Sequence, residues 1–138
     1  MLSNAKGKVL YERSGGMMTL SDVQGIRIAG MRRTFVDMRK IETYIPEEAL
    51  KDIQEALLSV DAGHIGKYRG CMNWYPVTGA WIPQEGSQPL IGNTNERSVE
   101  PELKVEVVIK DEQTEETVST IRRVHPYEEP VINVIQLV

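Results

Sequence analysis

The order in which the hydrophobic patterns follow one another constrains the fold of this chain more than any other feature. Residues 103–110 alternate apolar and mainly polar side chains, as do residues 41–45, and a period of two is typical of a strand with one buried face. Each of these segments is followed by apolar residues at helical spacing, at positions 50–60 and 118–124. Further extended sequence follows each predicted helix, and the last of it is an apolar strand at 132–138.

The resulting order is strand, helix, strand, strand, helix, strand, which is the order of the split βαβ unit. We therefore predict a ferredoxin-like α+β fold, in which an antiparallel sheet carries two helices on one face. The strand order of such a sheet is 4-1-3-2. The strands that follow the two helices then form opposite edges of the sheet.

The central part of the chain predicts a hairpin followed by a long loop. Tyr68–Trp74 and Val77–Ile82 are predicted as strands, with a turn at Tyr75-Pro76 between them. Pro83–Pro101 carries three prolines and two glycines among polar residues and is predicted as a loop. A loop of this length in a compact domain usually has a function or contacts a partner.

Composition limits the class of protein. The 138 residues suit one domain, which we place at 36–138, and residues 1–35 are expected to be an N-terminal extension, either an arm or a non-native start ahead of Met17 or Met18. The net charge of −4 argues against a nucleic-acid or anionic-membrane partner. A single cysteine, Cys71, excludes a disulfide framework. No segment resembles a secretory signal or a membrane span, so a cytoplasmic location is expected.

The chain has two histidines, and each follows a predicted helix. Imidazole is a common transition-metal ligand, and Glu128, close to His125, could complete a site. The alternative is that His64 and His125 cap the last carbonyls of their helices. The two edges of the predicted sheet are three strand spacings apart, roughly 14 Å. That separation is too large for one metal ion about 2 Å from each ring, so a shared site would form only between subunits.

Aromatic side chains lie close together on the predicted hairpin. Trp74, Tyr75 and Trp81 are neighbours in the sequence, and such groups cover ligands or anchor subunit interfaces. The glycines of the following loop lack the spacing of a P-loop, and Cys71 has no nucleophile motif around it. We therefore expect subunit assembly or ligand stacking at the hairpin.

Four segments carry a family resemblance. They are Gly63–Tyr68 (GHIGKY), Gly79–Pro83 (GAWIP), Gly86–Gly92 (GSQPLIG) and His125–Pro130 (HPYEEP). In this order they resemble the insert domain of the YqfO (NIF-three-like) family, a domain that also exists as a stand-alone small protein. The resemblance covers residues 36–138, three quarters of the chain.

The resemblance implies a fold similar to the CutA and PII signalling proteins. Those proteins form trimers whose sheets face inward, with ligands or metals in clefts between subunits. Within the matching motifs it points to His64 and Tyr68 in the first and to His125, Tyr127 and Glu128 in the last. Full-length family members also have a larger domain that binds two metal ions. Since no part of this sequence matches that domain, we do not expect a hydrolase-like activity to carry over.

We therefore expect a non-enzymatic homotrimer that binds a metal ion or a small ligand at subunit clefts. A divalent metal would be held by His64, His125 and Glu128. A ligand would contact the aromatic side chains, namely Tyr68, Trp74, Trp81 and Tyr127. Two alternatives stay open: a protein-interaction or regulatory module whose long loop contacts a partner, and a small metal-dependent hydrolase. The lack of a nucleophile motif or a dense ligand cluster disfavours the hydrolase.

Overall fold

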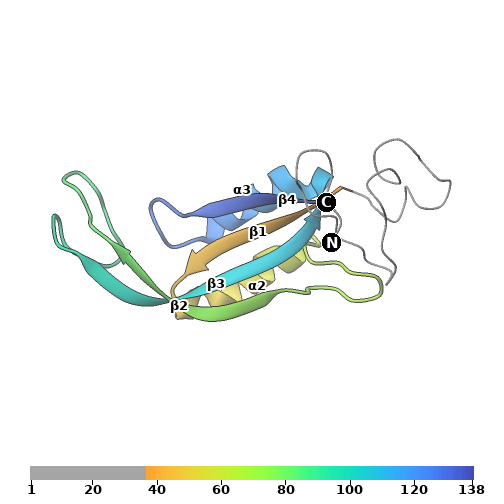
Figure 1. The fold of residues 1–138 in the computed structure, drawn as a ribbon, viewed down its shortest axis with the longest axis horizontal. Coiled ribbons are helices and arrows are strands. Elements are labelled where there is room, and N and C mark those ends of the chain that lie inside the picture. Colours follow the sequence, from red (N-terminus) through yellow and green to blue (C-terminus); the bar gives the residue numbers. More distant parts are fainter. Residues whose placement is uncertain (1–36) are drawn as a thin grey trace.

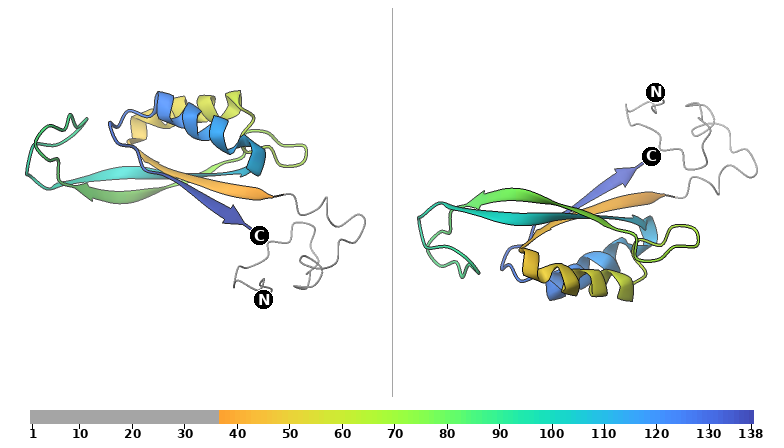
Figure 2. Two further views of the ribbon diagram at one scale, coloured as in Figure 1. Left: turned by 90° about the horizontal axis from the view of Figure 1, so that it is seen from above. Right: turned by 90° about the horizontal axis from the view of Figure 1, so that it is seen from below.

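The computed structural model describes residues 37–138, which form a four-stranded antiparallel sheet with two α-helices against one face (Figures 1 and 2). The elements are β1 (Met38–Ile45), the 3-10 turn η1 (Glu47–Ala49), α2 (Leu50–Ser59), β2 (Asn73–Trp81), β3 (Ser98–Lys110), the 3-10 turn η2 (Asp111–Gln113), α3 (Thr114–Val124) and β4 (Ile132–Leu137). The sheet order is β2-β3-β1-β4. The predicted ferredoxin-like α+β fold is confirmed. The predicted extension at residues 1–35 lies outside the described residues.

The hydrophobic core lies between the sheet and the two helices. β1 and β3 pair in antiparallel register, from Met38 opposite Lys110 to Ile45 opposite Leu103. Alternate residues of these strands face the helices and are buried together with the apolar faces of α2 and α3. The most deeply buried are Ile41, Ile45, Ile53, Leu57, Val105, Val107, Ile109 and Ile121. Since burial of each such side chain contributes about 1.5–3 kcal/mol, the patterns that predicted the elements also hold the layers together.

β2 differs from the predicted hairpin. It is one continuous strand from Asn73 to Trp81, and it pairs with β3 along its whole length, so the turn predicted at Tyr75-Pro76 is wrong. Pro76 lies opposite Leu103 within the strand. Among the strands of residues 37–138, β2 pairs with β3 alone, and an edge strand tolerates a proline wherever no N–H has to be donated to the ladder.

β3 begins earlier than predicted, because Ser98–Glu102 already pair with the outer half of β2. The predicted loop therefore ends before Ser98, and Pro101 lies inside the strand, opposite Thr78. Only residues 103–110 of β3 pair with β1. The outer parts of β2 and β3 consequently extend beyond β1 as a two-stranded ribbon, whose loop folds back toward the helix side (Figures 1 and 2).

Gly63 sets a tight turn after α2. Its φ is +81°, and a Cβ at this position would lie 2.3 Å from the carbonyl oxygen of Cys71. The Cys71 amide donates a 2.9 Å hydrogen bond to the Gly63 carbonyl. Glycine is therefore required where the chain leaves the helix and starts the turn that leads into β2.

Within residues 37–138, neither α-helix has the length and hydrophobicity that a membrane crossing requires.

Candidate ligand site at the projecting ribbon

A cavity of about 500 Å³ lies where the ribbon extends past the end of β1. Three segments form its walls: residues 77–81 of β2, part of the loop that follows at 82–91, and the segment 127–131 that leads into β4. Tyr44 and Glu102 complete the lining. Segments distant in the sequence therefore meet at this end of the sheet.

The loop that forms one wall is held at its base and at its middle. The Asn95 amide donates a 2.7 Å hydrogen bond to the Pro83 carbonyl, which closes the base. The indole Nε1 of Trp81 donates a 3.1 Å hydrogen bond to the carbonyl of Ile91. These contacts fix the position of the loop and the orientation of the Trp81 ring.

Trp81 and Tyr127 form an aromatic corner of the cavity. Their ring centroids are 6.2 Å apart, and the ring planes are tilted by 46°. Tyr127 also lies against His125, with 5.0 Å between the ring centroids. Both rings are partly exposed, so the corner offers aromatic surface to a ligand.

Glu102 is a buried carboxylate in the cavity wall, with 8% of its surface exposed. The Tyr127 hydroxyl donates a 2.7 Å hydrogen bond to its Oε2. Burial, together with the Glu102 carboxylate, raises the pKa of Tyr127 above its ordinary value, so the hydroxyl keeps its proton and remains a donor. Gly79 makes room for Glu102, because a Cβ there would lie 1.9 Å from Oε1.

His125 packs against Tyr127, one of the residues that line the cavity. Its ring is buried, and Nε2 lies 2.9 Å from the carbonyl oxygen of Tyr44 in β1. The amide of Tyr127 donates to Nδ1 at 3.2 Å, so Nε2 carries the proton that is donated to Tyr44. Burial lowers the pKa of His125. The neutral ring thus joins the segment after α3 to the end of β1, rather than capping helix carbonyls with its side chain.

Glu128 joins the same segment to the loop. Its Oε2 accepts a 2.9 Å hydrogen bond from the amide of Gln88. Four of the predicted site residues therefore lie in or beside this cavity: Trp81, His125, Tyr127 and Glu128.

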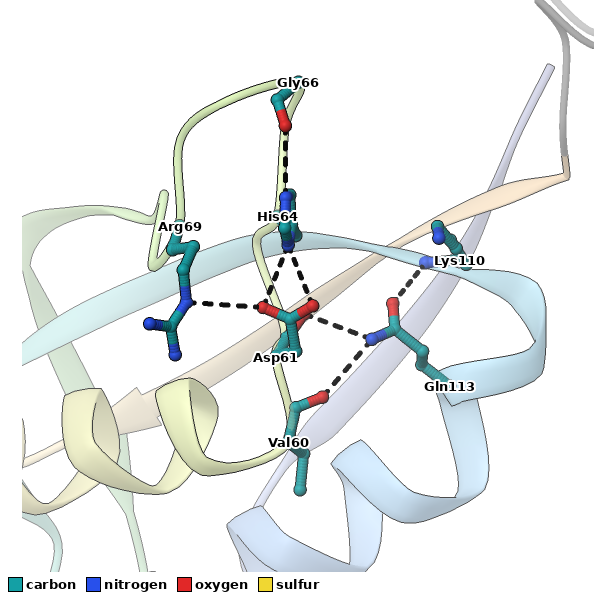
Figure 3. A network of polar contacts seen from close by, with 7 residues as sticks. All are labelled: Val60, Asp61, His64, Gly66, Arg69, Lys110 and Gln113. Carbon is teal, nitrogen blue, oxygen red and sulfur yellow. Dashed lines mark hydrogen bonds and ion pairs between the residues drawn. The ribbon is translucent and has the colours of Figure 1, made fainter.

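His64 lies in a different region, the exposed turn after α2 (Figure 3). Its Nδ1 contacts both carboxylate oxygens of Asp61, at 2.8 and 3.1 Å, and its Nε2 lies 3.1 Å from the Gly66 carbonyl oxygen. Arg69 Nε is 3.8 Å from the same carboxylate. His64 therefore bonds within its own turn, and its side chain does not cap the helix carbonyls.

Gln113 connects that turn to the start of α3 (Figure 3). Its Nε2 donates to the carbonyls of Val60 and Asp61, and its Oε1 accepts from the Lys110 amide. Lys110 pairs with Met38 at the start of β1. These contacts place the His64 turn at the end of the sheet where β3 ends and β1 begins.

The two histidines lie near opposite ends of β1, since His125 contacts Tyr44 close to the last residue of that strand. An eight-residue strand is about 23 Å long, so their separation exceeds the roughly 14 Å expected from strand spacing alone. In residues 37–138 no three His, Cys, Asp or Glu side chains are grouped as a metal ion would require. A metal held by His64, His125 and Glu128 stays a prediction that involves more than one copy of the chain.

No family model matches the chain. Residues of this chain are 33% identical over 104 residues to a protein of Halalkalibacterium halodurans named GTP cyclohydrolase 1 type 2 homolog, covering 75% of this chain and 28% of that protein. A Mycobacterium tuberculosis protein of the same name is 33% identical over 102 residues, 74% of this chain and 27% of that one. The chain thus spans little more than a quarter of the length of these curated relatives.

A crystal structure of a Bacillus cereus protein related to NIF3 superposes with a TM-score of 0.65 at 27% identity, over 74% of this chain and 26% of that chain. The resemblance to the YqfO (NIF-three-like) family is confirmed. The periplasmic divalent cation tolerance protein CutA from Archaeoglobus fulgidus has a TM-score of 0.53 at 21% identity, over 71% of this chain and 81% of that one. The GlnK–ATP complex from B. subtilis has a TM-score of 0.52 at 16% identity, over 73% of this chain and 82% of that chain. The fold is therefore CutA/PII-like.

The other two predicted ligand contacts, Tyr68 and Trp74, lie away from the cavity. Tyr68 is 74% exposed, in the turn that contains His64. Trp74 and Trp81 are seven positions apart in the same strand, so they point to opposite faces of β2. The aromatic residues that are neighbours in the YqfO-like sequence are thus divided between two surfaces.

Glu102 and Gly79 are the site residues that sequence reasoning missed. Glu102 lies between the predicted loop, which ends at Pro101, and the predicted strand at 103–110. Its place follows from the strand register in the structure: because β2 is continuous, Glu102 lies opposite Val77, on the ribbon that also carries Trp81.

The sheet face opposite the helices carries a compact set of ion pairs. Lys104 Nζ lies 3.3 Å from Glu42 Oε2 and 3.5 Å from Glu106 Oε2, and Lys40 Nζ contacts the same two carboxylates at 3.2 and 3.7 Å. Burial alone would raise the pKa of Glu42, but hydrogen bonds from Lys40 and Lys104 lower it overall. The two positive and two negative charges neutralise one another across β1 and β3.

Proposed function

We propose that this domain is a non-enzymatic, CutA/PII-like module that assembles as a homotrimer and binds a small organic ligand in the cavity at the projecting ribbon. The observation that carries the proposal is a cavity of about 500 Å³ that combines an aromatic corner with a buried, oriented carboxylate. Ligand sites commonly combine a largely apolar lining with a few placed polar groups.

Contacts within the protein already hold the aromatic side chains of the cavity in position. Trp81 is oriented by Ile91, and Tyr127 is oriented by Glu102 and lies against His125. Side chains already held in place lose little conformational entropy when a ligand binds. This favours a binding function over a merely structural loop.

The trimer is supported by the fold and by the open sheet face. In the CutA and PII proteins, which the family resembles, the sheets of three subunits face inward. The open face here carries charges that are already paired with one another, so a neighbouring sheet can cover it without leaving an isolated charge. The ribbon projects from the body, where it can reach a neighbouring subunit and place the cavity at a subunit cleft.

We propose no metal for the cavity, because among the described residues its carboxylates, Glu102, Glu128 and Glu129, are not grouped as the ligands of one ion would be. The predicted metal bound by His64, His125 and Glu128 would require two copies to meet. Elemental analysis of the purified protein distinguishes this alternative, because a stoichiometric divalent metal would support it.

The test combines assembly with binding. Size-exclusion chromatography with light scattering is expected to give three times the chain mass. NMR screening with a library of small metabolites is expected to shift the Trp81 indole N–H signal, which is assigned with the Trp74→Phe variant. A monomer would contradict the assembly, and a library without any compound that shifts the Trp81 signal would contradict the ligand site.

A further inference from the structure

The charges around the cavity are of one sign. Its lining includes the carboxylates of Glu102, Glu128 and Glu129, and no lysine, arginine or histidine is among the described residues that line it. Glu48 and Glu100 also lie close enough to the Tyr127 hydroxyl to act on its proton. The electrostatic potential inside the cavity is therefore negative.

Two basic groups that contact lining residues do not balance these carboxylates. The ammonium of Lys104 is 5.8 Å from the centre of the Tyr44 ring, but it is paired with Glu42 and Glu106 on the open sheet face. His125 uses both ring nitrogens in hydrogen bonds with backbone groups and is neutral as bonded. The positive charge that would balance the cavity is not supplied by these neighbours.

One carboxylate oxygen of Glu102, Oε1, can accept a further hydrogen bond. Tyr127 donates to Oε2, and no donor among the residues that the structure describes contacts Oε1. The residue as a whole is 8% exposed and belongs to the cavity wall. Oε1 is not among the described side-chain atoms that are fully buried without a partner, so it is open to water and to a ligand that can donate a hydrogen bond to it.

We infer that the cavity selects a small organic cation, an amine whose ammonium group donates to Glu102 Oε1 while its apolar body packs between Trp81 and Tyr127. This inference rests on the proposed ligand-binding function and names the class of ligand. Aromatic faces add to the attraction, because indole and phenol rings bind cations within about 6 Å of their centres.

The same charges exclude phosphates and nucleotides from this cavity. A nucleotide would bring several negative charges against Glu102, Glu128 and Glu129, with no basic residue of the lining to receive them. Although one structural neighbour is a GlnK–ATP complex, the chemistry of this cavity favours ligands of the opposite charge.

The experiment uses the full chain and three probes of similar shape: 2-phenylethylamine, 2-phenylethanol and 3-phenylpropionate. Each is titrated while the Trp81 indole N–H signal is followed by NMR in the Trp74→Phe background, and ATP is titrated in parallel. We expect the amine to bind at least about tenfold more tightly than the alcohol, in line with a hydrogen bond to a charged group. We expect 3-phenylpropionate and ATP to leave the signal unchanged.

Two variants test the role of Glu102. Glu102→Gln is expected to weaken amine binding about tenfold and to leave the alcohol unaffected. Gly79→Ala keeps the carboxylate but pushes it aside, because the new Cβ would lie 1.9 Å from Oε1, and the same loss is expected. Glu55→Gln, on the exposed side of α2, is the matched control and should bind the amine like the wild type.

The possible failures have different meanings. Tighter binding of 3-phenylpropionate or ATP, equal binding of amine and alcohol, or equal losses in Glu102→Gln and Glu55→Gln would overturn the cation selectivity and leave the proposed ligand site standing. If none of the four probes shifts the Trp81 signal, while library compounds do, the inference fails alone. If nothing shifts it, the proposed function fails as well. Folding of each variant is checked from its amide spectrum, and Gly79→Ala carries the test if Glu102→Gln does not fold.

Discussion

The two histidines of this chain have similar positions in the sequence, but one is buried and the other is exposed. Each histidine follows an amphipathic helix, yet His125 is 8% exposed and spans two backbone groups from separate segments, whereas the His64 side chain is 41% exposed and bonds within its own turn. The difference arises because α2 and α3 run in opposite directions, so their ends meet different parts of the sheet. The environment of a helix end, rather than its local sequence, decides what a histidine there does.

The largest effect is expected from His125→Ala. The substitution leaves the Tyr44 carbonyl and the Tyr127 amide without their partner in a buried site, and it removes the ring that packs against Tyr127. We expect a loss of about 3 kcal/mol in the free energy of unfolding, measured by urea denaturation. A loss no greater than that of His64→Ala would remove the distinction between the two turns.

Tyr127→Phe is expected to lower the free energy of unfolding by about 2 kcal/mol. The substitution removes the hydroxyl that donates a hydrogen bond to the buried, charged Glu102 carboxylate. Tyr68→Phe is the matched control, since Tyr68 is 74% exposed and should change stability by less than about 0.5 kcal/mol. Thermal unfolding monitored by circular dichroism compares the two. Equal changes would show that the Glu102 contact contributes nothing.

The pH dependence of stability should include a contribution from His125. Burial holds the pKa of His125 below its ordinary value of 6.5, so the unfolded chain takes up a proton before the folded chain does. The contribution of His125 is complete above pH 6.5 and declines as the pH falls from 6.5 toward the lowered folded pKa. Urea midpoints between pH 8 and 5 should fall in the wild type and should fall less in His125→Gln.

The smallest effect is expected from His64→Ala. The ring bonds Asp61 and Gly66 in an exposed turn, and such exposed pairs contribute about 0–1 kcal/mol. We expect a loss below about 1 kcal/mol in urea denaturation, reduced further in high salt. A larger loss that persists at 1 M salt would mean that the turn is held by more than these contacts.

The body of the fold could be predicted from the sequence because its signals are local. The alternation in β1 and β3 and the helical spacing in α2 and α3 each bury one face, and the order of the four patterns leaves few topologies. The ribbon could not be predicted in the same way. Pro76 and Pro101 are typical of turns and loops, and their place inside paired strands follows only from the edge position of β2 and the length of β3.

The candidate site was predicted in part. Trp81 was selected because aromatic residues are few outside the predicted hairpin, and Tyr127 and Glu128 because they lie beside His125 in the HPYEEP motif of the family resemblance. The fold brings all three to one cavity. Their partner Glu102 could not be recognised, because its burial depends on Tyr127, 25 residues away, and on the space that Gly79 leaves. Trp74 was selected on closeness in the sequence, which in a strand says nothing about a shared face.

The hydrogen bond from Asn95 to Pro83 has an evolutionary consequence. It closes the loop on itself, so the residues between can be lengthened, shortened or exchanged while the ladder of β2 and β3 keeps its register. Descendants of one ancestral gene could thus acquire new ligands by remodelling a single surface segment, with the sheet beneath it inherited unchanged.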